Sequence, residues 1–408
     1  MKLIRWLLNL IWFILRFFIG LALLFALLQL FCVPVYDFPV KKVFSGDKYY
    51  NPYQGCDTSW WKKSVFHKHT KSWGGITHGN SSEKETFARY EYLGYDIVAL
   101  SDYQKINKAK FDKQSEYIPN YEHGFGMKKN HHLSIGAKSV LPFDFLFPQT
   151  TSNKQFIINL LRSRTDVLVL AHPDWNGAVT DYDVKRLCDY DCIEIFSNYH
   201  SSINIWDSAL SAGMPVFLLA NDDNAEIENP NVVGRCLTLV NTEKTTLAGV
   251  TEALKKGKTI GVRVFSNENE SWESKKKNID NIPVLKSFEL SGDTLRISFS
   301  AKAKTISFIG QNGIVEKTDS NALQSYYILK NTDTYVRTHI VFDNGTEFYL
   351  NPVIRYNGSN FNIYHATLNV WITLIKNLIF LGILALLIFI YLRKYHRKKG
   401  LSVISKFQ

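Results

Sequence analysis

Two long apolar runs, one near each end of the chain, dominate the pattern of hydrophobic and polar positions. Trp6–Cys32 contains only three polar residues, and Asn377–Leu392 is almost wholly apolar, with Val370–Ile375 extending it upstream. About 20 consecutive apolar residues are enough for a helix to span a bilayer. The pattern therefore predicts an N-terminal transmembrane anchor over residues 1–33 and a second transmembrane helix over residues 370–392.

The charges that flank these runs predict how the helices are oriented. Lys2 and Arg5 precede the first run, and five basic residues between Arg393 and Lys399 follow the second. Because lysine and arginine are enriched on the cytoplasmic side, we expect both termini in the cytoplasm and residues 34–369 outside it. Residues 393–408 would be a basic cytoplasmic tail, and the lipid bilayer of the cell membrane would be the partner of both helices. The first run is longer than the apolar core of a cleaved signal peptide, which favours a retained anchor.

Between the two runs, a proline-rich linker over residues 34–58 leads into short apolar strands that alternate with helices as far as residue 265. The predicted strands are Phe66–His69, Asp96–Ser101, His132–Ile135, Asp166–Ala171, Cys192–Phe196 and Val216–Ala220. The predicted helices are Ser82–Gly94, Gln155–Ser163, Asp181–Cys188, Trp206–Ser211 and Thr246–Lys256. This alternation predicts parallel βα units over residues 59–265. Several of the strands end in a histidine, aspartate or asparagine, and the carboxyl ends of the strands carry the active site in a βα barrel.

A charged linker over residues 266–283 separates this region from a stretch with a different pattern. Residues 284–360 read as short strands with turn signals between them, including a good hairpin turn at Asp343–Gly345, and no helical segment. This pattern predicts a small all-β sandwich. The expected fold class is thus α/β, with a barrel and a sandwich flanked by two transmembrane helices.

Composition and charge exclude some classes of function. The chain has 408 residues and a formal net charge of +11, but much of the excess lies beside the apolar runs, and no long basic run occurs between them. A nucleic-acid partner is therefore not inferred. The five cysteines do not form a disulfide framework, and the spacing of Cys188 and Cys192 is not that of a redox or zinc motif.

Histidine is concentrated in the α/β region, where eight of the eleven histidines lie between His67 and His200. His67 and His69 are two residues apart in a predicted strand, so their side chains share one face. Imidazole and carboxylate groups together suit Zn, Mn or Fe. A carboxylate flanked by histidines is what a site with two hydrolytic metals requires.

The α/β region resembles the PHP (polymerase and histidinol phosphatase) domain. The motifs that carry the resemblance are His67–Thr70 (H-x-H-T), Gly94–Asp102, Ile118–Glu122, His132–Gly136, Ala171–Pro173, Ala220–Asp223 and Gly257–Val262. The resemblance covers roughly residues 60–265 and implies a distorted TIM-like (βα)7 barrel that binds divalent metals. The β module resembles one that is often appended to such domains, through Tyr335–Arg337 and Asn351-Pro352.

The resemblance also implies which residues bind the metals. His67, His69 and Asp222 would bind the first metal, and Glu122 would bridge it to a second metal held by His132 and His172. Three alternatives stay open, namely Asp223 in place of Asp222, His131 in place of His132, and His78 as a further ligand.

Two departures from the family pattern bear on activity. Tyr103 follows Asp102 where the family usually has histidine, and Asn224 or Ala225 replaces a histidine in the last motif. These changes imply two metals (Zn, Mn or Fe) instead of three. The resemblance implies a membrane-tethered phosphoesterase that hydrolyses a phosphorylated substrate outside the cytoplasm with a metal-activated water. Asp102 and Tyr103 are weak candidates for a catalytic side chain, and no other is assigned. The alternative is a catalytically degenerate, metal-binding surface receptor or assembly protein.

Overall fold

The computed structural model describes residues 2–77, 79–358, 361 and 363–404, which fold into two compact units. The helical unit combines Met1–Phe38, Phe145–Phe156 and Ala366–Gln408. The sheet unit combines Pro39–Asp144 and Ile157–His365. The chain is a mixed α/β protein, and every residue of the site described below belongs to the sheet unit.

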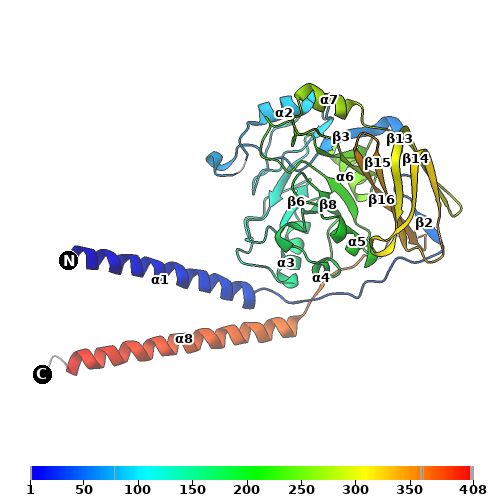
Figure 1. Cartoon of the computed structure of the whole chain (residues 1–408). Helices are drawn as coiled ribbons and strands as arrows, with labels where there is room; N and C mark the ends of the chain where they lie inside the picture. The colour runs from blue at the N-terminus through cyan, green and yellow to red at the C-terminus, as the bar shows by residue number, and fades with distance from the viewer. Residues whose placement is uncertain (1, 78, 359–360, 362, 405–408) are drawn as a thin grey trace. The chain divides into compact units, whose positions relative to one another are not determined.

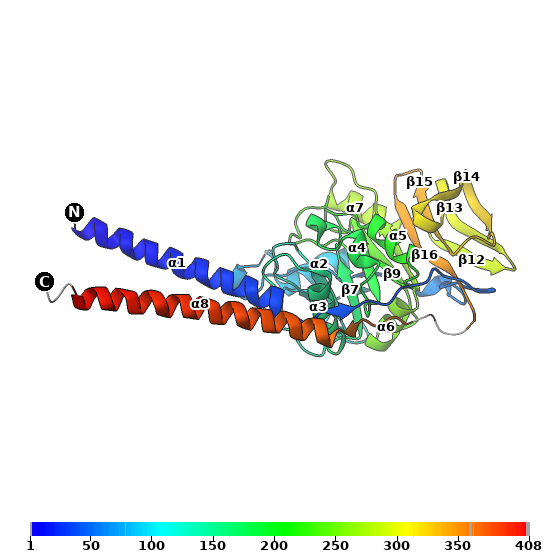
Figure 2. The ribbon, with the colours of Figure 1, turned by 90° about the horizontal axis from the view of Figure 1, so that it is seen from below.

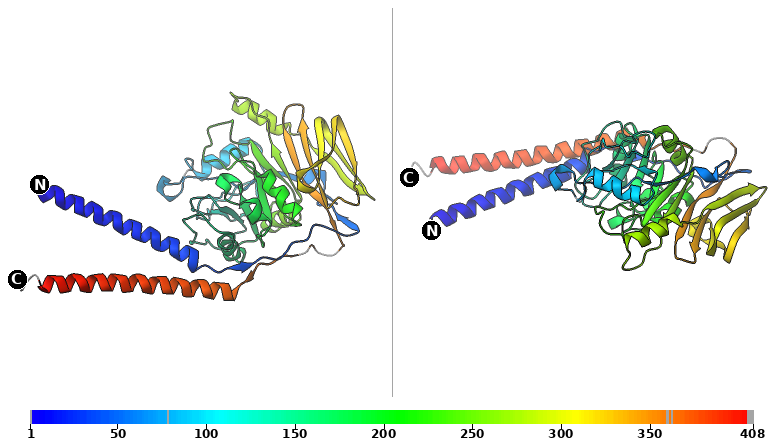
Figure 3. Two further views of the ribbon diagram at one scale, coloured as in Figure 1. Left: turned by 60° about the horizontal axis from the view of Figure 1, so that its bottom comes forward. Right: turned by 90° about the horizontal axis from the view of Figure 1, so that it is seen from above.

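Two long helices form most of the helical unit, α1 (Lys2–Phe31) and α8 (Val370–Ile404) (Figure 1). Within them, Leu3–Phe31 and Val370–His396 are long and apolar enough to cross a membrane. Figure 3 shows the two helices side by side. The structure therefore contains two helices with the length and composition that the sequence predicted for membrane-spanning segments.

Short contacts hold the three parts of the helical unit together. Strand β1 (Tyr36–Asp37) pairs antiparallel with β17 (Thr367–Leu368) directly before α8 begins. The Gln29 side-chain amide donates a hydrogen bond of 3.0 Å to the carbonyl of Phe147. The segments next to the two helices are thus fixed to each other by backbone and side-chain hydrogen bonds.

The strands of the sheet unit form two sheets among the described residues. The larger sheet contains β2 (Lys48–Tyr50), β3 (Trp61–Val65), β4 (Ile97–Val98), β10 (Cys236–Asn241), β11 (Thr259–Arg263), β12 (Leu285–Ser291), β13 (Thr294–Ile309), β14 (Val315–Ile328), β15 (Tyr335–Phe342) and β16 (Glu347–Tyr356). Its order is β12-β13-β15-β16-β11-β10-β3-β4, with β14 beside β13 and β2 beside β16. All of its pairs are antiparallel except β3 with β4.

The smaller sheet positions most of the site. Its strands, in sheet order, are β5 (Asn120–His123), β6 (His131–Ile135), β7 (Val167–Ala171), β8 (Cys192–Phe196) and β9 (Phe217–Ala220). The first three are antiparallel, and β7, β8 and β9 are parallel. The prediction of parallel βα units is thus confirmed for β7 to β9, and strands of this sheet are buried on both faces, as such units require.

Helix α2 (Glu83–Tyr92) of the sheet unit begins and ends close to where its capping residues predict. The other described helices of this unit are α4 (Asp181–Val184), α5 (Ile203–Ser211), α6 (Leu247–Lys255) and α7 (Trp272–Asp280), and α3 (Thr151–Arg162) spans both units. Ser82 and Glu85 form a capping box at the start of α2. Gly94, just beyond the end of α2, has a φ of +77°, a conformation that glycine adopts without strain.

Two features of the fold differ from the expectation. No closed barrel is found among the described strands, because the hydrogen bonds divide them into the two sheets. A separate sandwich is not confirmed for the strands after residue 284, since β16 pairs with β11 and joins them to the larger sheet. Figure 2 shows β12 to β16 lying together at one end of the sheet unit. Backbone pairing between β11 and β16 was not visible in the periodicity of either strand.

The two predicted linkers are also structured. Residues 266–283 contain helix α7, which begins after the capping residue Ser271. Within residues 34–58, Tyr53 is buried, and its hydroxyl donates to the carbonyl of Thr259 and accepts from the Asn351 amide, both at 2.7 Å. Part of the proline-rich segment is therefore packed against β11 and β16.

A buried ion pair joins the late strands to the helices around the smaller sheet. Arg337 on β15 donates from Nε and Nη2 to the two carboxylate oxygens of Asp207 on α5, at 2.6 and 2.7 Å. Both residues are buried. Two parallel, charge-assisted hydrogen bonds fix direction as well as distance.

This ion pair predicts a large loss of stability when only one partner is removed. Asp207→Ala leaves the Arg337 guanidinium buried without its carboxylate, and the free energy of unfolding should fall by about 3–5 kcal/mol. Guanidinium chloride unfolding of the full chain in detergent measures the change. Glu252→Ala removes the exposed pair with Lys256 and should change stability little. Equal effects of the two substitutions would contradict the role given to Asp207.

Candidate metal centre

The first two histidines lie just beyond the end of β3. Val65 ends the strand, and the following segment is held against the residues after β9. The amide of Phe66 donates to Asn221 Oδ1 at 2.7 Å, and the amide of Asp223 donates to the His67 carbonyl at 3.1 Å. These hydrogen bonds bring the ends of β3 and β9 together, so His67 and Asp223 approach each other.

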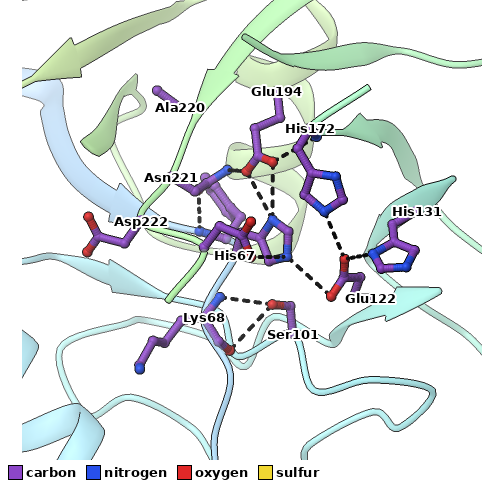
Figure 4. A network of polar contacts seen from close by, with 12 residues as sticks. His67, Lys68, Ser101, Glu122, His131, His172, Glu194, Ala220, Asn221 and Asp222 are labelled. Atoms are coloured by element: carbon purple, nitrogen blue, oxygen red, sulfur yellow. Dashed lines mark hydrogen bonds and ion pairs between the residues drawn. The ribbon is translucent and has the colours of Figure 1, made fainter. Parts of the chain in front are cut away.

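Glu122 on β5 lies at the centre of the cluster (Figure 4). Its Oε2 is 3.3 Å from His67 Nε2 and 3.1 Å from His69 Nε2. Its Oε1 is 2.6 Å from His131 Nδ1 and 3.3 Å from His172 Nε2. Each carboxylate oxygen thus faces a different pair of histidines, which is the arrangement that a carboxylate bridging two cations needs.

The ligand-capable atoms form three overlapping groups that could each hold a metal ion. Within each group, the atoms lie within 4.8 Å of one another. The groups are His67–His69–Glu122, Glu122–His131–His172 and His67–His172–Asp223. Ligand atoms that bind one zinc in a tetrahedral arrangement lie roughly 3.4 Å apart. The separations of 3.1 to 3.3 Å between His67, His69 and Glu122 fit that value.

Glu122 Oε1 is paired with His131 Nδ1 and His172 Nε2, but other ligand atoms of the cluster are buried without a hydrogen-bond partner. In the part of the chain that the structure describes, these atoms are His67 Nε2, His69 Nε2 and Glu122 Oε2. The carboxylate oxygen faces both nitrogens, at 3.3 and 3.1 Å. An unsatisfied buried polar group costs about 1–3 kcal/mol. A divalent cation among them would satisfy several at once, so the residues fit a metal.

Glu194, which the sequence reasoning missed, orients the cluster from behind. Its carboxylate lies 3.1 Å from His67 Nδ1 and accepts hydrogen bonds from the His172 amide at 3.0 Å and from Asn221 Nδ2 at 2.8 Å. Figure 4 shows it linking these three residues. A carboxylate that holds the far nitrogen of a metal-binding histidine fixes its tautomer. The available signal was a glutamate in the middle of the apolar strand Cys192–Phe196.

The structure corrects the preference for His132 over His131. In the antiparallel pair of β5 and β6, His132 is opposite His123, and Leu133 is opposite Glu122. Side chains alternate between faces, so His131 shares the face of Glu122 and His132 lies on the opposite face. His132 is in none of the three groups. The sequence could not decide this because a shift of one residue exchanges the two faces.

The structure also corrects the preference for Asp222 over Asp223. The Asp222 carboxylate accepts hydrogen bonds from the Tyr90 hydroxyl and from the amides of Gly234 and Cys236, at 2.7 to 2.9 Å. It points away from His67 in Figure 4. Asp223 Oδ1 lies 3.1 Å from His67 Nε2 instead. The third alternative ligand, His78, lies outside the described residues.

Asp102 is not part of the cluster. Its carboxylate accepts hydrogen bonds from the Thr70 amide at 2.7 Å and from Asn107 Nδ2 at 2.9 Å. These bonds fix the backbone directly after His69, so Asp102 supports the loop and does not reach the reacting centre.

Tyr103, which directly follows Asp102, contacts the cluster. Its ring stacks on His69 with the centroids 4.4 Å apart and the planes 10° apart. Burial and the carboxylate of Glu122 raise the pKa of Tyr103 far above its ordinary value. The hydroxyl therefore stays protonated and covers one side of His69.

Electrostatics keep the central carboxylates charged. Burial alone would raise the pKa of Glu122, but His131 and His67 outweigh burial and hold that pKa well below its usual value. Burial alone would lower the pKa of His67, but Asp223, Glu194 and Glu122 raise it well above its usual value. Three buried carboxylates thus surround His67, which is a favourable environment for cations.

Two residues of the cluster have strained backbones. His172 has a φ of +30° and Asp223 a φ of +47°, and neither is glycine. Such conformations cost of order 1–3 kcal/mol each and persist where the surrounding structure enforces them. Here the hydrogen bonds to Glu194 and His67 enforce them, and both side chains point into the cluster as a result.

Comparisons with known proteins add one distant likeness. No protein-family model matches the sequence, and no curated protein matches it. A crystal structure of a two-domain protein from Bacteroides vulgatus ATCC 8482, described as containing a predicted PHP-like metal-dependent phosphoesterase, aligns with 82% of this chain and 99% of its own. The TM-score is 0.37 and the sequence identity is 11%.

The geometry of β6 predicts different effects for two adjacent histidines. His131→Ala removes a proposed ligand atom. Loss of an outer-shell partner weakens metal affinity roughly 10- to 100-fold, so loss of a ligand should weaken it at least as much. His132→Ala should leave metal affinity unchanged. Elemental analysis after dialysis against limiting Zn²⁺ or Mn²⁺ measures both, and a thermal melt checks that each variant is folded. Metal loss in the His132 variant alone would contradict the assignment.

Proposed function

We propose that the protein is a metal-dependent phosphoesterase that hydrolyses a phosphate ester at a dinuclear centre. The observation that carries the proposal is the placement of Glu122 between two pairs of histidines, one facing each carboxylate oxygen. Sites of this kind, with two cations on a bridging carboxylate, serve in-line displacement at phosphorus. The resemblance of the sequence to the PHP domain agrees with this chemistry.

The residues divide into two ligand sets around Glu122. His67, His69 and Asp223 would hold one cation, and His131 and His172 would hold the other, with Glu122 shared. When bound, two divalent cations would supply a nucleophilic water at neutral pH and stabilise the negative charge that develops on the phosphoryl oxygens. Zn, Mn or Fe all suit imidazole and carboxylate ligands.

The surrounding residues orient these ligands and limit the access of water. Glu194 holds the ring of His67 and the backbone of His172, so both present fixed nitrogens to the centre. All the proposed ligands are less than one-tenth exposed. In hydrolysis the water oxygen bonds to phosphorus, the bond from phosphorus to the ester oxygen breaks, and the alcohol leaves with a proton. No side chain is assigned as the donor of that proton.

We also propose that the enzyme is anchored in the cell membrane by α1 and α8. Their length and apolarity support this, and the basic residues beside both segments support cytoplasmic termini. The sheet unit would then face the outside of the cytoplasm. Its substrate would be a phosphate ester present on that side of the membrane.

A second candidate function is a metal-binding protein without catalytic activity. The stacking of Tyr103 on His69, where the family pattern has a further histidine, favours this candidate. Such a protein would bind metal with the same residues but hydrolyse nothing. Turnover therefore separates the two candidates, and metal binding alone does not.

The proposal predicts metal-dependent turnover that depends on the Glu122 carboxylate. The full chain loaded with Mn²⁺ or Zn²⁺ should hydrolyse p-nitrophenyl phosphate or bis(p-nitrophenyl) phosphate. Glu122→Gln keeps the shape of the side chain but removes its charge, so kcat should fall by at least about 100-fold. Glu226→Gln, a change of charge outside the centre, is the control. Equal and negligible rates in wild type and in Glu122→Gln, with metal bound in the wild type, would favour the inert candidate.

Chelation should destabilise the folded protein as well as abolish turnover. A ligand present at 100 times its Kd stabilises the native state by about 2.7 kcal/mol. Removing metal with EDTA should lower the Tm of the wild type, and adding Mn²⁺ or Zn²⁺ should restore it. The Tm of His67→Ala/His69→Ala should respond much less. A Tm that does not change on chelation would contradict metal binding in the folded state.

A further inference from the structure

A cavity of about 480 Å³ lies beside the metal centre and has no role in the proposal so far. Its wall includes Tyr103, which stacks on His69, and His131, whose Nδ1 is 2.6 Å from Glu122. The volume lies within the range of small-molecule sites. A group bound in this cavity would therefore rest directly against the cluster.

The mouth of the cavity is lined by large apolar side chains that are exposed to solvent. Trp73, Ile76 and Phe125 are 55%, 90% and 50% exposed. Isolated exposed apolar residues are ordinary, but a group of them around one opening is typical of a binding site. Trp73 Nε1 donates a 2.8 Å hydrogen bond to the Tyr103 carbonyl, which fixes the indole over the cavity. We call this cavity, with Trp73, Ile76, Tyr103 and Phe125, the aromatic pocket.

An unpaired amide also lines the aromatic pocket. Among the described residues, both Gln104 Nε2 and Gln104 Oε1 are buried without a hydrogen-bond partner. A buried amide without partners is unfavourable by about 1–3 kcal/mol, so its presence indicates a ligand that satisfies it. Gln104 follows Tyr103 directly and has a φ of +50°, a strained conformation that turns the chain at this wall.

A positively charged side chain, that of Lys129, lies at the wall of the aromatic pocket. Lys129 lines the pocket, and its Nζ is 5.5 Å from the centre of the Trp175 ring. Trp175 in turn contacts His172, with ring centroids 4.8 Å apart. An ammonium group at this wall favours an anionic ligand in the pocket.

We propose that the aromatic pocket binds the organic part of the substrate, and that the substrate is a phosphate ester of an apolar, ring-bearing alcohol. The phosphoryl group would lie at the metal centre, the ring between Trp73, Tyr103 and Phe125, and a polar edge of the ring at Gln104. This inference rests on the proposed function. It goes beyond it by naming the chemical class of the alcohol.

The experiment compares two phosphonates that the enzyme cannot hydrolyse, because each has a carbon–phosphorus bond. 2-Naphthylmethylphosphonate carries a ring, and methylphosphonate does not. Their Kd values are measured by calorimetry with the full, Mn²⁺-loaded chain in lipid nanodiscs, which avoids detergent in the pocket. The pocket variant is Ile76→Ala/Phe125→Ala. The control variant, Ile314→Ala/Tyr326→Ala, removes two exposed side chains outside the pocket, one directly before β14 and one on it.

We expect wild type to bind the naphthyl compound at least about tenfold more tightly than methylphosphonate, because a buried aromatic ring contributes that much or more. The pocket variant should lose most of this difference while its Kd for methylphosphonate stays the same, and the control variant should keep the difference. Equal Kd values in wild type, no binding of either compound, or a difference that survives in the pocket variant would each overturn the proposal. If the difference depends on the pocket but no ester is hydrolysed, the pocket stands and the proposed function fails.

Discussion

A fully buried carboxylate must be compensated, and the compensation of Glu122 determines what surrounds it. Four imidazoles face its two oxygens, and Asp223 and Glu194 add further negative charge around His67. Without a cation, several buried nitrogen and oxygen atoms of these side chains have no hydrogen-bond partner among the described residues. The backbone strain at His172 and Asp223 persists where the same hydrogen bonds place the His172 side chain at Glu122 and the Asp223 side chain at His67. The requirement to hold cations accounts for all of these features together.

The two sheets deliver the ligands to one place by different routes. His67, His69 and Asp223 lie on loops just after β3 and β9, and Asn221 ties these loops together. Glu122 and His131 are neighbours on one face of β5 and β6, where the pairing fixes their separation. The late strands support this arrangement at a distance, because β16 extends the larger sheet through β11 and Arg337 anchors β15 to α5. The late strands are therefore continuous, through β16 and β11, with the sheet that carries β3.

The sequence was sufficient to predict most of the elements and the neighbourhood of the site. Strands β7 to β9 and helix α2 follow from apolar runs and capping residues, and His67, His69, Glu122 and His172 follow from motifs. The choice of His132 over His131 and of Asp222 over Asp223 was wrong in geometry, because each depends on a register or a backbone turn that neighbouring positions hide. The role of Glu194 and the pairing of β16 with β11 depend on contacts between distant segments, which no local pattern contains.

The geometry around Glu122 implies that this carboxylate bridges two cations. Crystals of the protein grown with Mn²⁺ or Zn²⁺, with diffraction recorded on both sides of the absorption edge of the metal, test it most directly. We expect two anomalous peaks, one beside each oxygen of Glu122, separated by about 3.5–4 Å as in other two-metal sites. One peak would lie near His67 and His69 and the other near His131 and His172. Two peaks elsewhere, or no peak beside Glu122 in protein soaked with metal, would contradict it.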